Sequence, residues 1–358
     1  NLGYSPVFRI GEDVETYTVT FDTDGGTAVP SQNVIYRGKV TKPETIPEKE
    51  LYTLDGWYTD DSYSKLFDFT NTIITKDTTI YAKYKKKDNC DKFAVDSWST
   101  IENNIKNIPD YYAVGCEKEV ELDMDDDNTP ESYTVRLANT STPEECSVDG
   151  YSQTACGTVI EFVDIVGNHI MNTERTNVGG WRETEMVTYL NSDFYNKLPS
   201  DLQSLIIPTY PIVSGSGSGV SGSINITEDD IGKNKIYLLS AREVGFDSSY
   251  DNKKDVTTDT RVLDCYVAQK GRTYKIKKDL SGSPKLWWLR TAGSSFSYAF
   301  HYVLEDGSCI RDSANIELGV APAFRIGTTP KNTVTFDTDG GSDVPSQTVI
   351  YGKKVTKP

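Results

Sequence analysis

The segment VTFDTDGGTAVPSQNVIY at residues 19–36 shows how this chain is organised, because VTFDTDGGSDVPSQTVIY returns at residues 334–351. The two stretches start 315 positions apart (334 − 19). The ends of the chain repeat as well, since NLGYSPVFRIG at 1–11 returns as ELGVAPAFRIG at 317–327, 316 positions later (317 − 1). Identity at a near-constant offset indicates a duplicated unit of roughly 315 residues, far larger than a solenoid repeat. The sequence therefore predicts a tandem array.

These repeats divide the chain into four segments. Residues 1–15 are expected to be the terminal strand of a preceding large domain and a linker. Residues 16–87 would form a small spacer, and residues 88–327 a larger domain with its own core. Residues 328–358 would be a linker and the start of the next spacer. Arrays of this kind favour a role in reach or avidity, because both grow with copy number.

Composition excludes two classes of partner. The 358 residues carry a formal net charge of −16, and a field of that sign repels phosphate backbones and anionic lipid heads. Nucleic acid is therefore not an expected partner. The sequence has no run of about 18 or more apolar residues, so no membrane span is expected in it.

The spacer reads as a β domain. Residues 18–23 alternate with a period of two, and Asp24-Gly25-Gly26 supplies a tight turn after them. Residues 78–84 alternate again and predict a closing strand. The motifs VTFDTDGG, LDGWYTD and DTTIYAKY resemble the internalin-type B repeat, or Listeria–Bacteroides repeat. The resemblance implies a β-grasp-like spacer of secreted bacterial surface proteins. We expect Trp57 in its core, with ligand contact as the alternative.

The larger domain mixes helices with strands. Apolar residues at helical spacing predict short helices around residues 101–108, 186–194 and 200–206. Apolar runs predict strands at 236–239 and 286–290. The expected fold class of the chain is therefore α+β and β, with a small β domain followed by a larger α+β domain.

Four motifs of this domain carry a second resemblance. NVGGW at 177–181, YLLSAREV at 237–244, WWLRTAG at 287–293 and GVAPAFRIG at 319–327 resemble an uncharacterised C-type-lectin-like domain of secreted bacterial proteins. At greater distance, the domain is similar to formylglycine-generating enzymes and to the variable receptor-binding domains of diversity-generating retroelements. The resemblance implies a compact α+β fold with two helices and twisted antiparallel strands, and it assigns no reaction.

The sequence shows few residues in arrangements typical of an active site. The oxidase relatives use reactive cysteines, but neither Cys265 nor Cys309 stands beside a base or a basic cluster in the sequence. The triplets by which sugar-binding C-type lectins hold calcium are absent, and two histidines without a Cys-x-x-Cys pair do not predict zinc. We therefore expect a protein that is not an enzyme and has no cofactor, and a formylglycine-type oxidase is the disfavoured third alternative.

Six cysteines in a chain of secreted type suggest disulfides. The short loop between Cys146 and Cys156 favours that pair, and two buried thiols are the alternative. Such a bond could add about 3 kcal/mol through the entropy of the denatured state. Six cysteines allow 15 pairings. The set would be completed by Cys90 with Cys116 and by Cys265 with Cys309.

An acidic run offers one candidate metal site. Asp123, Asp125 and Asp127 present carboxylates at alternate positions, like the start of a calcium loop. Asn128 replaces the glycine expected at the sixth position, and the twelfth position lacks a glutamate. Calcium is therefore one hypothesis, and a solvated acidic turn is the other.

The candidate binding surface follows the WWLR motif. Every second residue from Phe296 to Tyr302 is aromatic, so these side chains share one side of an extended segment. They either face the core or form an exposed aromatic platform suited to binding. The opposite side and the following loop are the other surface candidates. The full candidate set is Phe296, Tyr298, Phe300, His301, Tyr302, Glu305, Asp306 and Arg311.

Together these features predict a repeat unit of a secreted bacterial cell-surface protein with a structural or adhesive role, such as a stalk, an adhesin or an extracellular filament. The alternative is a lectin-like module that binds a protein or a glycan. The expected partners are other copies of the chain, joined covalently or by strand addition, and a host or bacterial surface protein or glycan. The expected location is the cell surface or the extracellular space.

Overall fold

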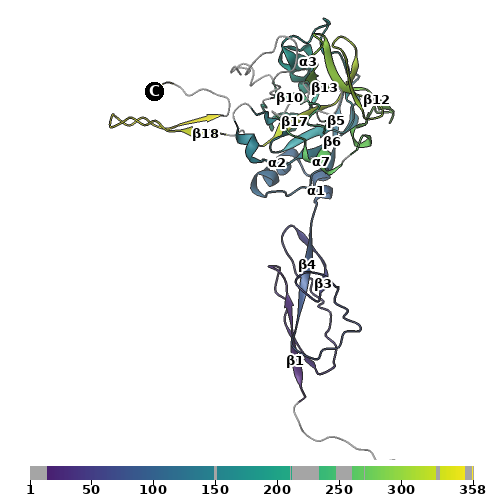
Figure 1. Ribbon diagram of the computed structural model, residues 1–358, viewed down its shortest axis with the longest axis vertical. Coiled ribbons are helices and arrows are strands. Elements are labelled where there is room, and N and C mark those ends of the chain that lie inside the picture. Colours follow the sequence, from purple (N-terminus) through teal and green to yellow (C-terminus); the bar gives the residue numbers. More distant parts are fainter. Residues whose placement is uncertain are drawn as a thin grey trace, which may run out of the picture. The chain divides into compact units, whose positions relative to one another are not determined.

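The computed structural model describes residues 14–148, 151–209, 211, 234–246, 260–269, 271–327, 331–350 and 357. The chain divides into two compact units, Asn1–Asp88 and Asn89–Pro358. The terminal strand predicted within residues 1–15 lies outside the described residues, apart from Val14 and Glu15. Figure 1 shows the elements of both units.

The first unit is a four-stranded sheet in the order β2-β1-β4-β3. Its outer pairs are antiparallel, whereas β1 and β4 in the centre run parallel. The predicted turn after β1 is present, with Asp24 and Gly25 at positive φ (44° and 80°). Its strands are β1 (Thr16–Asp22), β2 (Gln32–Ile35), β3 (Tyr52–Tyr58) and β4 (Thr78–Lys86).

Trp57 anchors the core of this unit, as predicted. Its ring meets the ring of Phe21 edge to face, with centroids 5.2 Å apart, and both side chains are buried. Val19 and Ile80, from the paired central strands, are fully buried beside them. Replacing a buried Trp by Ala costs about 3–5 kcal/mol, a large loss for a core with so few members.

The start of the next spacer forms the same hairpin as the first. β18 (Lys331–Val334) pairs antiparallel with β19 (Gln347–Ile350), and Val334 lies opposite Gln347. In the first spacer Val19 lies opposite Gln32, so both members of the pair are displaced by 315 positions (334 − 19 and 347 − 32). The two copies of the repeated sequence therefore form hairpins whose strands pair in the same register.

The second unit is built around two larger sheets. The six-stranded sheet has the order β10-β17-β7-β6-β5, with β9 also paired to β17, and the five-stranded sheet has the order β15-β14-β13-β16-β8. Apart from the parallel pair β13 and β16, the strand pairs of both sheets are antiparallel. The strands of the six-stranded sheet are β5 (Glu117–Leu122), β6 (Glu131–Asn139), β7 (Val159–Phe162), β9 (Ile206–Ile207), β10 (Ile236–Leu238) and β17 (Pro322–Ile326). Those of the five-stranded sheet are β8 (Gly167–His169), β13 (Trp287–Ala292), β14 (Ala299–Val303), β15 (Cys309–Ser313) and β16 (Leu318–Val320). A short extra hairpin joins β11 (Lys277–Lys278) to β12 (Pro284–Lys285).

Short helices flank these sheets, and α1 and α3 lie at opposite ends of the unit (Figure 1). The three helices predicted from apolar spacing are confirmed as α2, the run from α3 through a π-helical turn to α4, and α5. No described helix is both long enough and apolar enough for a bilayer crossing.

The α-helices are α1 (Cys90–Val95), α2 (Trp98–Asn107), α3 (Glu185–Tyr189), α4 (Tyr195–Lys197), α5 (Ser200–Gln203) and α7 (Asp264–Ala268). The 3-10 and π turns are η1 (Glu144–Ser147), η2 (Gln153–Ala155), η3 (Gly180–Glu183), η4 (Leu190–Phe194) and η5 (Thr273–Lys275). The described part of the chain is therefore β-rich α+β.

A buried ion pair ties the two large sheets together. Arg290 of β13 donates to both carboxylate oxygens of Glu243, each at 2.5 Å, and neither side chain is exposed. The same guanidinium donates to the carbonyl of Leu238 in β10 at 2.7 Å. The hydroxyls of Thr154 and Thr260 donate to the carboxylate as well. Because the donors surround it, the Glu243 carboxylate keeps its charge inside the core.

A second buried carboxylate, Glu161 of β7, holds the six-stranded sheet to α7 and β11. It accepts from Arg136 at 2.8 Å, from Lys277 at 3.1 Å and from the hydroxyl of Tyr266 at 3.0 Å. Burial alone would raise the pKa of Glu161, but the charges of Arg136 and Lys277 outweigh burial and hold it at about 2.

Two disulfides form, and the third predicted pair does not. Cys90 bonds to Cys116, and Cys146 bonds to Cys156. Cys265 and Cys309 are instead buried thiols, so the predicted bond between them is wrong. The physical reason is that they lie on different elements, the helix α7 and the strand β15, and meet different groups. The sulfur of Cys265 on α7 is 3.6 Å from a carboxylate oxygen of Glu161, whereas the sulfur of Cys309 on β15 is 3.6 Å from Nδ1 of His301.

The Glu161 cluster makes the larger unit sensitive to acid. A carboxylate whose pKa is depressed from about 4.3 to about 2 stabilises the folded state above pH 4.3 and loses that stabilisation as the pH falls toward 2. The loss is on the order of 3 kcal/mol. We predict that Glu161→Gln has a lower free energy of unfolding than the wild type at pH 7. At pH 2 the difference in free energy of unfolding between the two proteins should be smaller by roughly 3 kcal/mol.

Urea unfolding followed by tryptophan fluorescence at pH 7, 4 and 2 measures this gap, since Trp98, Trp181, Trp287 and Trp288 all lie in the larger unit. Glu121→Gln, at an exposed position of β5, is the control and should track the wild type. A gap between Glu161→Gln and the wild type that does not change with pH would contradict the assignment.

Candidate functional site

The aromatic stretch after β13 splits into a buried half and an exposed half. Phe300 and Tyr302, both on β14, are buried, and Tyr302 meets Trp288 edge to face at 5.7 Å. Phe296 is 40% exposed and Tyr298 is half-buried. Phe300 and Tyr302 therefore face the core, whereas Phe296 and Tyr298 lie at the surface.

His301 is also buried, at 5% exposure, so the expectation that its side of the strand faces solvent is wrong. The reason is that both faces of β14 are covered, in addition to its pairing with β13 and β15 along its edges. All five residues of β14 are buried. A period-two argument separates an inner from an outer face only when one face of the strand is open.

The exposed half forms a compact cluster that we name the aromatic–arginine patch, consisting of Phe296, Tyr298, Arg175 and Arg311. The two rings lie 5.5 Å apart at an interplanar angle of 53°. The guanidinium carbon of Arg175 is 3.9 Å from the ring centroid of Tyr298, and that of Arg311 is 4.8 Å from the ring centroid of Phe296. Each ring thus carries an arginine on one face, which adds a cation–π attraction of about 0.5–1 kcal/mol at such exposed sites.

Asn177 fixes the backbone beneath this patch. Its side-chain amide donates to the carbonyls of Gly293, Phe296 and Ala299 at 2.9, 2.8 and 2.8 Å. Its own backbone amide donates to the carbonyl of Ser297 at 2.8 Å. The turn that presents Phe296 and Tyr298 is therefore held by one buried side chain from a distant part of the sequence. Such preorganisation lowers the entropic cost of binding.

Glu305 and Asp306, also predicted, lie at the other end of β14 and do not join the patch. Both are exposed in the turn before β15. Asp306 accepts from the backbone and hydroxyl of Ser308 at 2.9 and 2.5 Å, and these bonds lower the pKa of its carboxyl. A five-residue strand is about 17 Å long, too far for the two groups to contact one small ligand. Only Arg311 of the outlying candidates reaches the aromatic rings.

The acidic run lies in the turn between β5 and β6. Carboxylate oxygens of Asp123, Asp125 and Asp127 lie within 4.8 Å of one another. The Asp123 carboxylate accepts from the backbone amides of Asp127 and Asn128 at 3.1 and 3.0 Å. These bonds are those of an acidic turn that caps itself, and calcium binding there stays a prediction.

The roles of three residues in or near this site were not predicted from the sequence, for different reasons. Arg175 lies about 120 positions from the rings that it covers, and nothing local indicates the contact. Asn177 opens the NVGGW motif, so the motif was noticed but not the role of its first residue. Arg290 could have been found, because a charged residue inside the apolar run WWLRTA signals a buried partner.

Comparison with known families assigns both parts of the chain. Residues 17–83 and 333–358 match the Listeria-Bacteroides repeat domain, and residues 158–328 match a domain of unknown function (DUF6273). The chain therefore contains one copy of this repeat, the start of a second, and the domain of unknown function between them. The resemblance of the spacer to this repeat is confirmed.

Relatives with sequence similarity match about a fifth of the chain. A "Putative Gly-rich membrane protein" of Evansella cellulosilytica is 34% identical over 73 residues, which is 20% of this chain and 8% of that protein. Internalin H of Listeria monocytogenes is 35% identical over 77 residues, which is 21% of this chain and 14% of that protein. The match thus spans only a small part of the length of either relative.

The Asn177 amide gives a direct test of how the patch is held. Asn177→Ala removes a donor shared by three carbonyls, and leaving buried acceptors unsatisfied costs about 1–3 kcal/mol. We predict that loss in urea unfolding, together with faster amide hydrogen exchange at residues 293–299. Val178→Ala is the adjacent control, 55% exposed, and should change stability by less than about 0.5 kcal/mol. Equal effects of the two substitutions would show that Asn177 does not have this role.

Proposed function

We propose that this chain is a unit of a secreted bacterial cell-surface protein in which the Listeria-Bacteroides repeat is a β-grasp-like spacer and the larger domain is a C-type-lectin-like adhesive module. The observation that carries the proposal is the aromatic–arginine patch, one exposed ring and one half-buried ring with an arginine on each. Tyr and Arg are enriched at the energetic centres of protein interfaces. The patch is therefore the surface by which the module would adhere.

The chemistry of the patch favours a protein partner that offers acidic residues. The two guanidinium groups of Arg175 and Arg311 present positive charge on a chain whose net charge is −16. A sugar that stacks on a ring needs an open ring face, and an arginine covers one face of each ring. Carboxylates of a partner could instead pair with the guanidinium edges in the bidentate manner that arginine favours. A glycan ligand is the alternative.

The repeated hairpin supports an array. Because the β1–β2 and β18–β19 pairings share one register, the spacer recurs as a structural unit and not only as a sequence motif. An array of adhesive modules multiplies weak contacts into avidity. Other copies of the chain would then be neighbours in the same polypeptide or filament.

Two observations support a location outside the cell. The bonds Cys90–Cys116 and Cys146–Cys156 form where the environment is oxidising. Two of the relatives are named as putative membrane proteins.

The thiols argue against an oxidase. Cys265 is 1% exposed, and burial, aided by the neighbouring charge of Glu161, raises the pKa of its thiol. A buried, protonated thiol is a poor nucleophile. We predict that Ellman's reagent labels neither Cys265 nor Cys309 rapidly in the native protein at pH 7, and both after unfolding in guanidinium. Rapid labelling of the native protein, or turnover of a thiol substrate, would favour the oxidase alternative.

Binding to immobilised surface proteins tests the adhesive role. We expect the chain to bind members of an array of bacterial and host surface proteins. The double variant Tyr298→Ala, Arg311→Ala should bind at least about tenfold more weakly, since each hot-spot truncation costs more than 1 kcal/mol. Circular dichroism would confirm that the variant is folded.

The matched control is Tyr36→Ala with Arg37→Ala in the spacer, where an exposed tyrosine also carries an arginine near its ring, at 6.0 Å. This control should bind like the wild type. A glycan array run in parallel distinguishes the alternative ligand. The proposal fails if both double variants bind alike, or if the wild-type chain binds nothing on either array.

A further inference from the structure

A cavity of about 560 Å³ lies in the larger unit, away from the aromatic–arginine patch. Its wall is formed by the end of α2 and the following loop to Tyr112, by residues of the segments 140–147 and 153–158, by Ile207, and by residues 325–327 at the end of β17. That volume is typical of sites for small organic ligands. The patch described above contributes none of these residues.

One wall residue, Arg325, is a buried cation without a counter-charge. The residue is 7% exposed, its buried Nε has no hydrogen-bond partner, and its guanidinium forms no ion pair with any residue that the structure describes. Burial accordingly lowers the pKa of its guanidinium. The other arginines buried in this unit, Arg136 and Arg290, each meet a carboxylate. An unpaired buried charge costs several kcal/mol, so a fold that keeps one is poised to receive an anion.

The guanidinium faces open space because its neighbour has no side chain. A Cβ atom placed on Gly157 would lie 3.4 Å from Nη2 of Arg325 and 3.6 Å from Oγ1 of Thr142. All three residues line the cavity. The missing side chain at Gly157 therefore leaves room between a cation and a hydroxyl, which is the arrangement that a carboxylate group needs.

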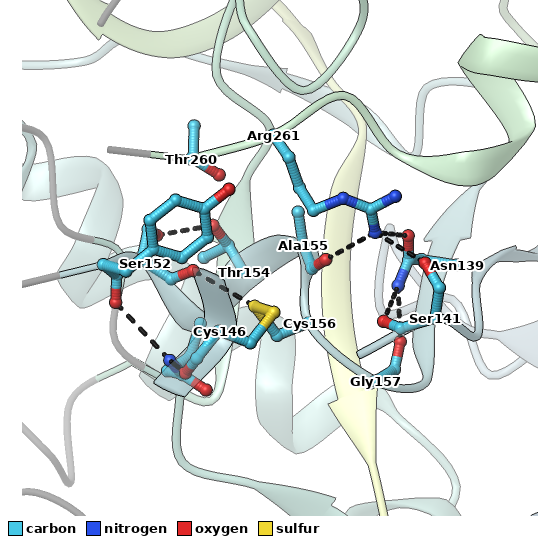
Figure 2. Close-up of a disulfide and its surroundings, with 12 residues drawn as sticks. Asn139, Ser141, Cys146, Ser152, Thr154, Ala155, Cys156, Gly157, Thr260 and Arg261 are labelled. Atoms are coloured by element: carbon cyan, nitrogen blue, oxygen red, sulfur yellow. Dashed lines mark hydrogen bonds between the residues drawn. A yellow bond between two sulfur atoms is a disulfide. The ribbon is translucent and has the colours of Figure 1, made fainter. Parts of the chain in front are cut away.

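The walls near this point are held firmly. The disulfide Cys146–Cys156 joins the wall segments 140–147 and 153–158 (Figure 2). Gln153 also donates to the carbonyl of Cys146 at 3.0 Å. Arg261, also in Figure 2, is fully engaged, since it donates to Asn139, Ser141 and Ala155 at 2.9, 2.7 and 3.3 Å. Two arginines of one region thus differ sharply, one saturated with acceptors and one with no ion-pair partner among the described residues.

We propose that this cavity binds a small organic monocarboxylate, whose carboxylate pairs with Arg325 beside Gly157 and whose apolar part lies against Ile207 and Ile326. The charge favours a monoanion, because the other charged lining residues, Lys106 and Asp110, are exposed and of opposite sign. One carboxylate neutralises one guanidinium, whereas a phosphate dianion would leave an excess buried charge.

Isothermal titration with simple probes tests the site in the intact chain. Benzoate should bind with a Kd below about 1 mM, and its neutral analogue benzamide should bind at least about tenfold more weakly, because it cannot form the ion pair. Inorganic phosphate should also bind more weakly than benzoate. Binding of phosphate tighter than that of benzoate, or no binding of benzoate at all, would overturn the proposal.

Three variants separate this site from a structural role of the arginine. Arg325→Met should abolish benzoate binding and raise the midpoint of thermal unfolding of the ligand-free protein, because it removes an unpaired buried charge. Thr142→Trp, at an exposed lining residue, should block the cavity while leaving Arg325 in place. Arg261→Met, which also removes one positive charge, should lower stability and keep benzoate binding.

If Arg325→Met does not fold, Thr142→Trp decides the question alone. A folded Thr142→Trp that binds benzoate like the wild type, or an Arg325→Met that binds it unchanged, would overturn the proposal. Loss of binding in Thr142→Trp with retention in Arg261→Met would support it.

Discussion

The larger unit depends on one buried ion pair, that between Arg290 and Glu243. Arg290 belongs to one sheet, while the carbonyl of Leu238 that it also binds belongs to the other, so the pair fixes how the two sheets meet. Such a pair is a weak source of net stability, because both charges must leave water. It is a strong source of specificity, because any packing that separates the two charges leaves both uncompensated. The aromatic–arginine patch begins a few residues after Arg290, so its position depends on how this ion pair holds the two sheets.

The repeats, the main strands and helices, the core role of Trp57 and two of the disulfides were all predictable from the sequence. Most rest on short-range information: identity at a fixed offset, a period of two or about 3.6, or the short loop between Cys146 and Cys156. The bond Cys90–Cys116 was only one of the pairings that six cysteines allow. The burial of His301 and the separate surroundings of Cys265 and Cys309 were not predictable, because they depend on what covers both faces of β14 and on which groups pack against α7 and β15. Contacts such as that of Arg175 with Tyr298 join residues that only the finished fold brings together.

The arginines of this unit show how one residue type serves opposite purposes. Arg136 and Arg290 are buried against carboxylates and hold the interior, whereas Arg175 and Arg311 lie over exposed rings and shape a surface. Arg325 follows neither pattern, because it is buried and no carboxylate among the described residues pairs with it. Its motif, FRIG, stands at residues 8–11 and again at 324–327, 316 positions later (324 − 8), so each further copy of the unit would carry this residue.

The central pairing of the spacer has a mechanical consequence. The chain enters this domain through β1 and leaves through β4, and these two strands lie side by side and parallel over four paired positions from Val19 and Thr78 to Asp22 and Tyr81. A pull on the two ends of the domain would slide one strand lengthwise past the other. All the bonds between them would then bear load together and would have to break at once, whereas an antiparallel hairpin pulled at its open end unzips one bond at a time. A polypeptide made of such spacers would resist stretching by shear.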